Sequence, residues 1–163
     1  MQPLKLNAMK KLFYLLLALP LALLASCSKE EVAPFNMTLT MGNVTTSGTT
    51  FYAVQGEDVT IEGLEVQATG NSKTDVANVM FYLDGMPLLG IPGAPFNGTF
   101  STANIPAGQH TIGVSGTLLQ VDHSLKTIAV NYPFTIVESQ DDLPSGAADL
   151  GTYGVTISVS NSD

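Results

Sequence analysis

From Phe35 onward, short runs of β-branched and aromatic residues alternate with clusters of Gly, Asn, Asp and Pro. No segment of this region keeps a helical period beyond a turn or two, and apolar residues often occupy every second position. Because successive side chains of a strand point to opposite faces, this pattern predicts half-buried strands joined by tight turns. The expected strands are 35–41, 50–54, 58–68, 76–83, 86–89, 95–101, 109–119 and 126–137. The sequence therefore predicts an all-β fold, an antiparallel β-sandwich.

Three local signals refine these expected strands. In the third strand the apolar alternation slips by one residue at Glu62-Gly63, and a β-bulge at this glycine would restore the inward face. The fourth strand ends in Asp84-Gly85, which predicts the two-residue turn of a hairpin. In the last long strand, Pro133 lies on the face opposite to the apolar residues. Because proline cannot donate to a ladder, we expect an edge or a bulge there.

The first 26 residues have the layout of an export signal. Three lysines precede an uncharged, Leu-rich run of fourteen residues, 12–25, which ends in small side chains. A transmembrane helix needs about 20 apolar residues, so this run is short for a permanent span. Pro20 also weakens a helix there. We therefore expect residues 1–26 to be a cleaved signal peptide.

The signal ends in Leu24-Ala25-Ser26-Cys27, which closely resembles the lipobox of bacterial lipoproteins. The resemblance implies that signal peptidase II cleaves between Ser26 and Cys27. It also implies that the Cys27 thiol takes a diacylglycerol and that the new amino group takes a further acyl chain such as palmitate. Several chains matter, because each buried methylene contributes only about 0.8 kcal/mol. The alternative is an ordinary cleavage site that leaves Cys27, the sole cysteine of the chain, as a reactive thiol.

The residues that follow, Ser28-Lys29-Glu30-Glu31, resemble the surface-export signal of Bacteroidetes lipoproteins. This resemblance implies that the anchored protein reaches the outer membrane and faces the cell surface. The alternative is a solvated tether with no address, because charged residues are expected after a lipid anchor in either case.

The expected strands also resemble a known family. The residues that carry the resemblance are Phe81-Tyr82-Leu83-Asp84-Gly85, Gly90, Ala94-Pro95-Phe96 and Ile105-Pro106-Ala107-Gly108-Gln109-His110-Thr111-Ile112. They look like a bacterial Ig-like module, in which an aromatic-x-aliphatic-Asp-Gly turn precedes a small-Pro-aromatic segment and a Gly-x-His-Thr entry to the penultimate strand. The match covers 57–137. It implies an Ig-like antiparallel β-sandwich over 35–137, carried on a lipidated polar tether of 27–34.

The tail, 138–163, starts as an acidic linker and ends in one more expected strand, 154–160. This strand either pairs with an open sheet edge of the same domain or resembles the first strand of an absent second module. We favour pairing within the domain, because Val155, Ile157 and Val159 would otherwise form an exposed apolar stripe that invites aggregation.

The charge balance excludes one class of partner. Three of the six lysines leave with the signal, all fourteen acidic residues remain, and the chain has no arginine. Three lysines against fourteen acidic residues give the mature chain a net charge of −11. Nucleic acid is disfavoured, because every phosphate contact needs a cation from the protein.

We expect no catalytic residue, cofactor or metal site. The chain has no Gly-x-Ser-x-Gly motif, and two histidines without a further cysteine cannot close a zinc site. His110 is expected to pack or hydrogen-bond locally, and His123 to lie in a solvated hairpin turn. Asp141, Asp142 and Asp149 offer oxygen ligands for calcium, but no Asp-x-Asp-x-Asp-Gly loop accompanies them, and a solvated linker is the simpler interpretation.

The sequence thus predicts a non-enzymatic, lipid-anchored module with a structural, adhesion or assembly role, whose partners are other cell-surface proteins or glycans. The alternative function is that of a carbohydrate-binding accessory lipoprotein of a glycan-uptake system. Tyr52 and Tyr82 fall out of phase with the core residues of their strands. They are the candidate ligand-binding side chains, because an outward tyrosine presents an apolar ring with a polar tip.

Overall fold

The computed structural model describes residues 34–68, 74–120, 123 and 125–160. These residues form nine strands and one short helix: β1 (Phe35–Ser47), β2 (Thr50–Val54), β3 (Asp58–Ala68), β4 (Thr74–Leu83), β5 (Met86–Ile91), β6 (Gly98–Ser101), β7 (Gly108–Gln120), β8 (Leu125–Val137), η1 (Gln140–Asp142) and β9 (Gly151–Val159). The expected signal peptide, Cys27 and the expected export signal lie outside the described residues.

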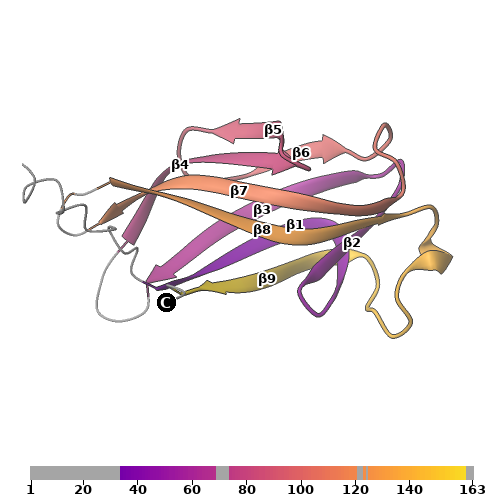
Figure 1. The fold of residues 1–163 in the computed structure, drawn as a ribbon. Coiled ribbons are helices and arrows are strands. Elements are labelled where there is room, and N and C mark those ends of the chain that lie inside the picture. The colour runs from indigo at the N-terminus through magenta and orange to yellow at the C-terminus, as the bar shows by residue number, and fades with distance from the viewer. Residues whose placement is uncertain (1–33, 69–73, 121–122, 124, 161–163) are drawn as a thin grey trace, which may run out of the picture. The chain divides into compact units, whose positions relative to one another are not determined.

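The strands lie in two layers that share β1 (Figure 1). One layer has the order β9-β1-β3-β6, and the other has the order β1-β2-β8-β7-β4-β5. Neighbouring strands are antiparallel except for β2 and β8, which run parallel. This arrangement is an Ig-like β-sandwich, as the sequence predicted.

The core fills the space between the two layers. In β8 every second residue from Ile128 to Ile136 is at most 5% exposed, in the phase that the sequence predicted. In β4, Val79 and Phe81 are buried, and Leu83 packs partly buried against the same core. Each such side chain stabilises the fold by about 1.5–3 kcal/mol relative to an exposed position.

β1 passes from one layer to the other within a few residues. Its pairing with β9 becomes irregular between Met41 and Val44, and from Thr45 onward it pairs with β2. Asn43 lies in this irregularity with a φ of 60°, and its side-chain amide donates a hydrogen bond to the carbonyl of Asp58 at 2.8 Å. Asparagine visits this left-handed conformation more readily than most residues. The backbone can therefore turn here without a break in the strand.

The predicted bulge and hairpin are both confirmed. Thr40 lies opposite Gly63 and Met41 opposite Ile61, so Glu62 is the extra residue of a bulge in β3. At the end of β4, Leu83 pairs directly with Met86. The two residues between them have φ angles of 49° and 82°, as the tight turn predicted for Asp-Gly requires.

Pro133 marks an edge rather than a bulge. The register between β7 and β8 is continuous through Pro133, which lies opposite Thr111. On the other side, β8 pairs with β2 only from Phe134 onward. The missing N–H of proline therefore falls where β8 has a neighbour on one side only.

Several predicted strand limits are wrong. β9 begins at Gly151 rather than at 154, and β5 ends at Ile91 rather than at 89. Two further differences have a local reason. β1 continues to Ser47 rather than ending at 41, because the conformation of Asn43 lets one strand serve both layers. β6 begins at Gly98 rather than at 95, and its ladder with β3 starts with Gly98 opposite Ile61. Pro95 has no N–H to donate to that ladder.

β9 pairs with β1 along almost its whole length, from Phe35 opposite Val159 to Val44 opposite Gly151. Val155 is 5% exposed, and the other apolar residues of the strand pack against the core. The favoured hypothesis, that the last strand pairs within the domain, is confirmed.

A buried hydrogen bond joins β8 to β1 through the core. The hydroxyl of Tyr132, in β8, donates to the carbonyl of Met37, in β1, at 2.8 Å, and Tyr132 is fully buried. Burial raises the pKa of the Tyr132 hydroxyl above its ordinary value, so the group stays protonated and remains a donor.

We predict that Tyr132→Phe lowers the free energy of unfolding by about 1–2 kcal/mol, because a buried carbonyl loses its donor. Tyr153→Phe is the matched control, since the Tyr153 hydroxyl also donates to a carbonyl at 2.8 Å, that of Asp149, but in an exposed place. Urea unfolding of both variants checks this. Equal losses in the two variants would contradict a special role for the bond through the core.

Thr45 gives a prediction of opposite sign. It is fully buried, and its hydroxyl has no hydrogen-bond partner within the part of the chain that the structure describes. Thr45→Val should therefore raise the free energy of unfolding by about 1 kcal/mol, because an unpaired buried hydroxyl is costly. Thr102 is the control, because it is equally buried but its hydroxyl bonds the carbonyls of Val54 and Glu57. Thr102→Val should destabilise the protein in the same urea titration.

Candidate functional site

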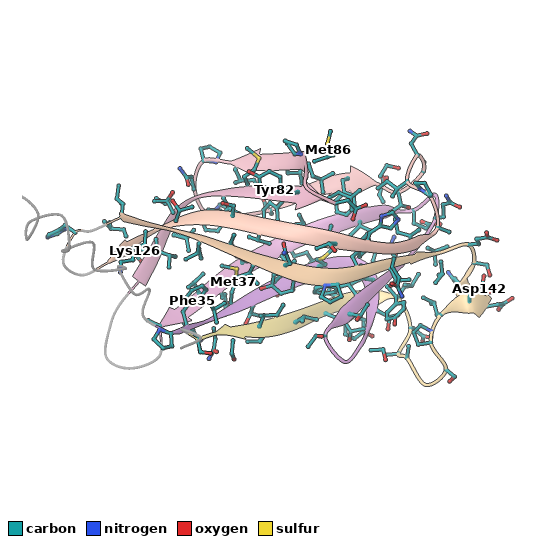
Figure 2. The ribbon with its side chains drawn as sticks, viewed as in Figure 1. Phe35, Met37, Tyr82, Met86, Lys126 and Asp142 are labelled. Carbon is teal, nitrogen blue, oxygen red and sulfur yellow. The ribbon has the colours of Figure 1, made fainter. Side chains whose placement is uncertain are left out.

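Both candidate tyrosines lie on one surface, which we call the outer face: the side of the β2-β8-β7-β4-β5 layer that points away from the core. Tyr52 in β2 is opposite Thr135 of β8, and Tyr82 in β4 is opposite Gly113 of β7. Their neighbours along the strands, such as Phe51 and Phe81, are fully buried. The two rings are therefore out of phase with the core, as predicted, and Figure 2 shows Tyr82 on the layer that also carries Met86.

Two adjoining hollows lie on the outer face between these tyrosines. The first, the Tyr52 hollow, has a volume of about 590 Å³. The second, the Tyr82 hollow, has a volume of about 270 Å³. Thr111 of β7 and Asn131 of β8 line both hollows. The two hollows therefore adjoin each other, and we call them together the depression, which crosses β2, β8, β7 and β4.

Gly113 brings an aromatic ring and an amide together at the middle of this depression. A Cβ at Gly113 would lie 3.3 Å from Oδ1 of Asn131 and 3.4 Å from Cβ of Tyr82. A larger residue in β7 would have to displace one of these side chains. Ser115 and Ala129 continue the floor of the Tyr82 hollow with small side chains. The depression thus has a flat floor with Tyr82 and Asn131 beside each other above it.

A charged pair closes one end of the Tyr52 hollow. Nδ1 of His110 lies 2.7 Å from Oδ2 of Asp84, and Nε2 of His110 lies 2.7 Å from the carbonyl oxygen of Pro106. The backbone N–H of Thr111 donates to Oδ1 of Asp84 at 2.8 Å. His110 therefore hydrogen-bonds locally, as predicted, and fixes the β4–β5 turn to the start of β7.

The geometry of this pair determines its charge state. A carboxylate and a carbonyl are both acceptors, so both ring nitrogens of His110 can donate only when the imidazole is protonated. Burial of His110 opposes this, but its hydrogen bonds with Asp84 and Pro106 prevail and raise the pKa of His110 above 6.5. The hydrogen bond with His110 is the main cause that lowers the pKa of Asp84 below 3.8. The pair is therefore an ion pair at mildly acidic pH.

We predict that Asp84→Asn destabilises the protein more at pH 5.5 than at pH 8.5. The raised pKa of His110 contributes stability that is complete below 6.5 and is lost as the pH rises through the folded-state value. The lowered pKa of Asp84 contributes stability above 3.8 that is lost as the pH falls. Asparagine tolerates the positive φ of the turn, so the substitution removes mainly the charge.

The difference should not exceed about 1 kcal/mol, because water screens the pair and the Asp84 side chain is 49% exposed. Urea unfolding at the two pH values measures it. An equal loss of stability at both would show that the pair is not ionised as described.

The other candidate residues lie apart from the outer face. His123 is exposed in the turn between β7 and β8, as predicted for a solvated hairpin. Asp141 and Asp149 line a separate hollow of about 490 Å³ beside η1, and Asp142 accepts a hydrogen bond from the hydroxyl of Ser139 at 2.7 Å. Within 34–68, 74–120, 123 and 125–160, no three His, Cys, Asp or Glu side chains are grouped as a metal site would require. No helix in those ranges has the length and apolar character to cross a membrane.

The sequence offered the two tyrosines as candidates but did not single out the polar groups between them. Asp84 was assigned only to a turn, and Asn131 and Gly113 were not singled out. The signal that could have found them is strand register. Once the Asp84-Gly85 hairpin and the phase of β7 and β8 are known, Gly113 and Asn131 fall level with Tyr82.

A match to a family model agrees with the Ig-like fold. Residues 45–114 match the family described as bacterial Ig domain, a segment that runs from the end of β1 into β7. No curated protein matches the chain. One similar solved structure is described as "Structures of Clostridium thermocellum CbhA fibronectin(III)-like modules". It is 16% identical, the match covers 60% of this chain and 97% of that one, and the TM-score is 0.38.

Proposed function

We propose that this chain is the precursor of a lipoprotein whose Ig-like domain is held to the outer membrane through Cys27 and faces the cell surface. The anchored domain has a structural, adhesion or assembly role toward other cell-surface proteins or glycans. Ig-like domains are typically non-catalytic modules, and we propose no enzyme activity and no cofactor for this one.

The observation that carries the proposal is the distance along the chain between the lipobox cysteine and the sandwich. β1 begins at Phe35, and seven residues separate it from Cys27. An extended chain of that length spans at most about 30 Å. The domain would thus lie close to the membrane, as expected of a module with a structural, adhesion or assembly role at the surface.

For an anchor at Cys27, the end of the domain near the membrane would be the end where β1 begins. Phe35, at the start of β1, pairs with Val159, near the end of β9. The opposite end of the sandwich, which we call the far end, carries the β2–β3 turn, the β4–β5 turn and the linker with η1. Figure 2 shows Phe35 and Lys126 toward one end and Asp142 at the other.

The distribution of charge supports this orientation. Of the ten acidic residues in the described ranges, seven lie at the far end: Glu57, Asp58, Asp84, Glu138, Asp141, Asp142 and Asp149. Lys126, at the start of β8, is the one lysine within those ranges and lies at the end where β1 begins. An acidic end is repelled by an anionic membrane surface, so an anchor at the start of β1 would point the far end outward.

We predict that Cys27→Ala abolishes incorporation of a palmitate analogue and releases the protein from the membrane fraction, because no thiol remains to take the lipid. Metabolic labelling followed by fractionation measures both. Ser28→Ala is the matched control and should keep lipid and membrane association. If the Cys27→Ala protein still incorporates lipid and still fractionates with membranes, the anchor is wrong.

The expected surface-export signal is tested separately. Replacing Lys29, Glu30 and Glu31 together by alanine should leave lipid incorporation intact while protecting the domain from protease added to whole cells. If protease still digests this variant on intact cells, the three residues are not an export signal and serve only as a tether.

A further inference from the structure

We propose that the outer face binds a neutral oligosaccharide, which lies along the depression formed by the two adjoining hollows between Tyr52 and Tyr82. This inference gives the proposed adhesion role a ligand class and rests on that role. The binding itself depends only on the described domain, so it can be tested apart from the lipid anchor.

The two tyrosines are placed to contact one ligand at separate points. Tyr82 is level with Asn131 of β8, and Tyr52 is level with Thr135, four residues further along the same strand. Tyr52 and Tyr82 are also three strand spacings apart across the layer. Spacings of about 4.8 Å between strands and about 3.3 Å per residue place the two roughly 20 Å apart. That separation suits a chain of several sugars and exceeds a single ring.

The depression offers hydrogen-bonding groups that the domain does not use. The side chains of Gln109, Thr111, Asn131 and Thr135 line the Tyr52 hollow. None of these four side chains has a hydrogen bond to another residue in the described ranges. Amides and hydroxyls supply both donors and acceptors, which is what a ligand covered with hydroxyl groups needs. The volume of about 590 Å³ is within the range of small-molecule sites.

The centre of the depression offers both an aromatic ring for apolar contact and an amide for hydrogen bonds. Gly113 lets the Asn131 amide and the Tyr82 ring stand side by side. An apolar face of a sugar ring can lie on the tyrosine while a hydroxyl of the same ring reaches the amide. Tyrosine is suited to this place because its ring is apolar and its hydroxyl stays wet.

The charges argue for a neutral ligand. Among the described residues, no lysine lines either hollow, and the chain has no arginine. The charged pair at the end of the Tyr52 hollow leaves the Asp84 side chain 49% exposed. A uronic acid or a sulfated sugar would meet that carboxylate and a strongly acidic domain without a counter-charge. A neutral sugar can instead donate a hydroxyl to Asp84.

A third hollow extends the depression along β4 and β7. It has a volume of about 430 Å³, contains Met80 and Gly90, and shares Ser115 with the Tyr82 hollow. Gly90 keeps this part open, because a Cβ there would lie 3.0 Å from the terminal carbon of Met80. A long ligand can therefore continue past Tyr82 in this direction.

The test uses the full lipidated chain in detergent and titrates it with cellohexaose, xylohexaose and mannohexaose, with an oligogalacturonate as the charged comparison. The readouts are calorimetry and tyrosine fluorescence, which is accessible because the chain contains no tryptophan. We expect at least one neutral hexasaccharide to bind, and Tyr52→Ala and Tyr82→Ala each to weaken it about two- to tenfold. Tyr82→Phe should retain binding, because the ring remains.

Two further variants separate the site from the fold. Gly113→Val should block binding by filling the space between Tyr82 and Asn131, whereas Tyr153→Phe, in the other layer, should have no effect. Thermal unfolding of each variant identifies any that fails to fold. Cys27→Ala should bind the oligosaccharide as the wild type does. A failure of the anchor therefore changes lipid incorporation, whereas a failure of the site changes oligosaccharide binding.

Four outcomes would overturn the inference. The first is that none of the neutral hexasaccharides binds at millimolar concentration. The second is that binding occurs but is unchanged in the folded Tyr52→Ala and Tyr82→Ala variants. The third is a preference for the oligogalacturonate. A photo-crosslinker at Asn131 that captures a protein on intact cells, with no oligosaccharide bound in solution, would assign the outer face to a protein partner and would also overturn it.

Discussion

The structure depends on a single strand that belongs to both layers. β1 pairs with β3 and β9 in one layer and with β2 in the other, and it can do so because Asn43 takes a left-handed conformation. This crossing fixes the separation of the layers along one side, and the hydrogen bond from Tyr132 to Met37 fixes it again within the core. Because these two contacts hold the layers together, the apolar side chains of the other strands all pack into the same space between the layers.

The two layers also determine which residues form the outer face. In each strand, alternate side chains face the core, so the remaining side chains lie on the outer face. In β7 and β8 these residues are small or polar, which leaves a depression instead of a convex surface. The Asp84–His110 pair holds one end of the depression at a fixed shape by tying the β4–β5 turn to β7. In the proposed site, side chains held on such a layer would lose little conformational freedom when a ligand binds.

Most of the fold was predictable from the sequence, because strand existence is a local property. Alternation, the Asp84-Gly85 turn and the slip at Glu62 each depend on neighbouring residues, and each prediction was right. The crossing of β1 was not predictable, because it depends on a hydrogen bond between Asn43 and the distant Asp58. The candidate site could be predicted only in part, for the same reason. Tyr52 and Tyr82 were recognised from strand phase, whereas the partners of Tyr82 come from two other strands and needed their register.

The pairing of Phe35 with Val159 has a mechanical consequence. Tension between an anchor before β1 and a ligand on the outer face would pull β1 along its own axis, against antiparallel neighbours on both sides. In that direction the ladder is sheared, and many hydrogen bonds share the load at once instead of opening one after another. The added strand β9 doubles the number of ladders that resist the pull. In the proposed anchored state, β9 thus reinforces the strand that would carry the tension.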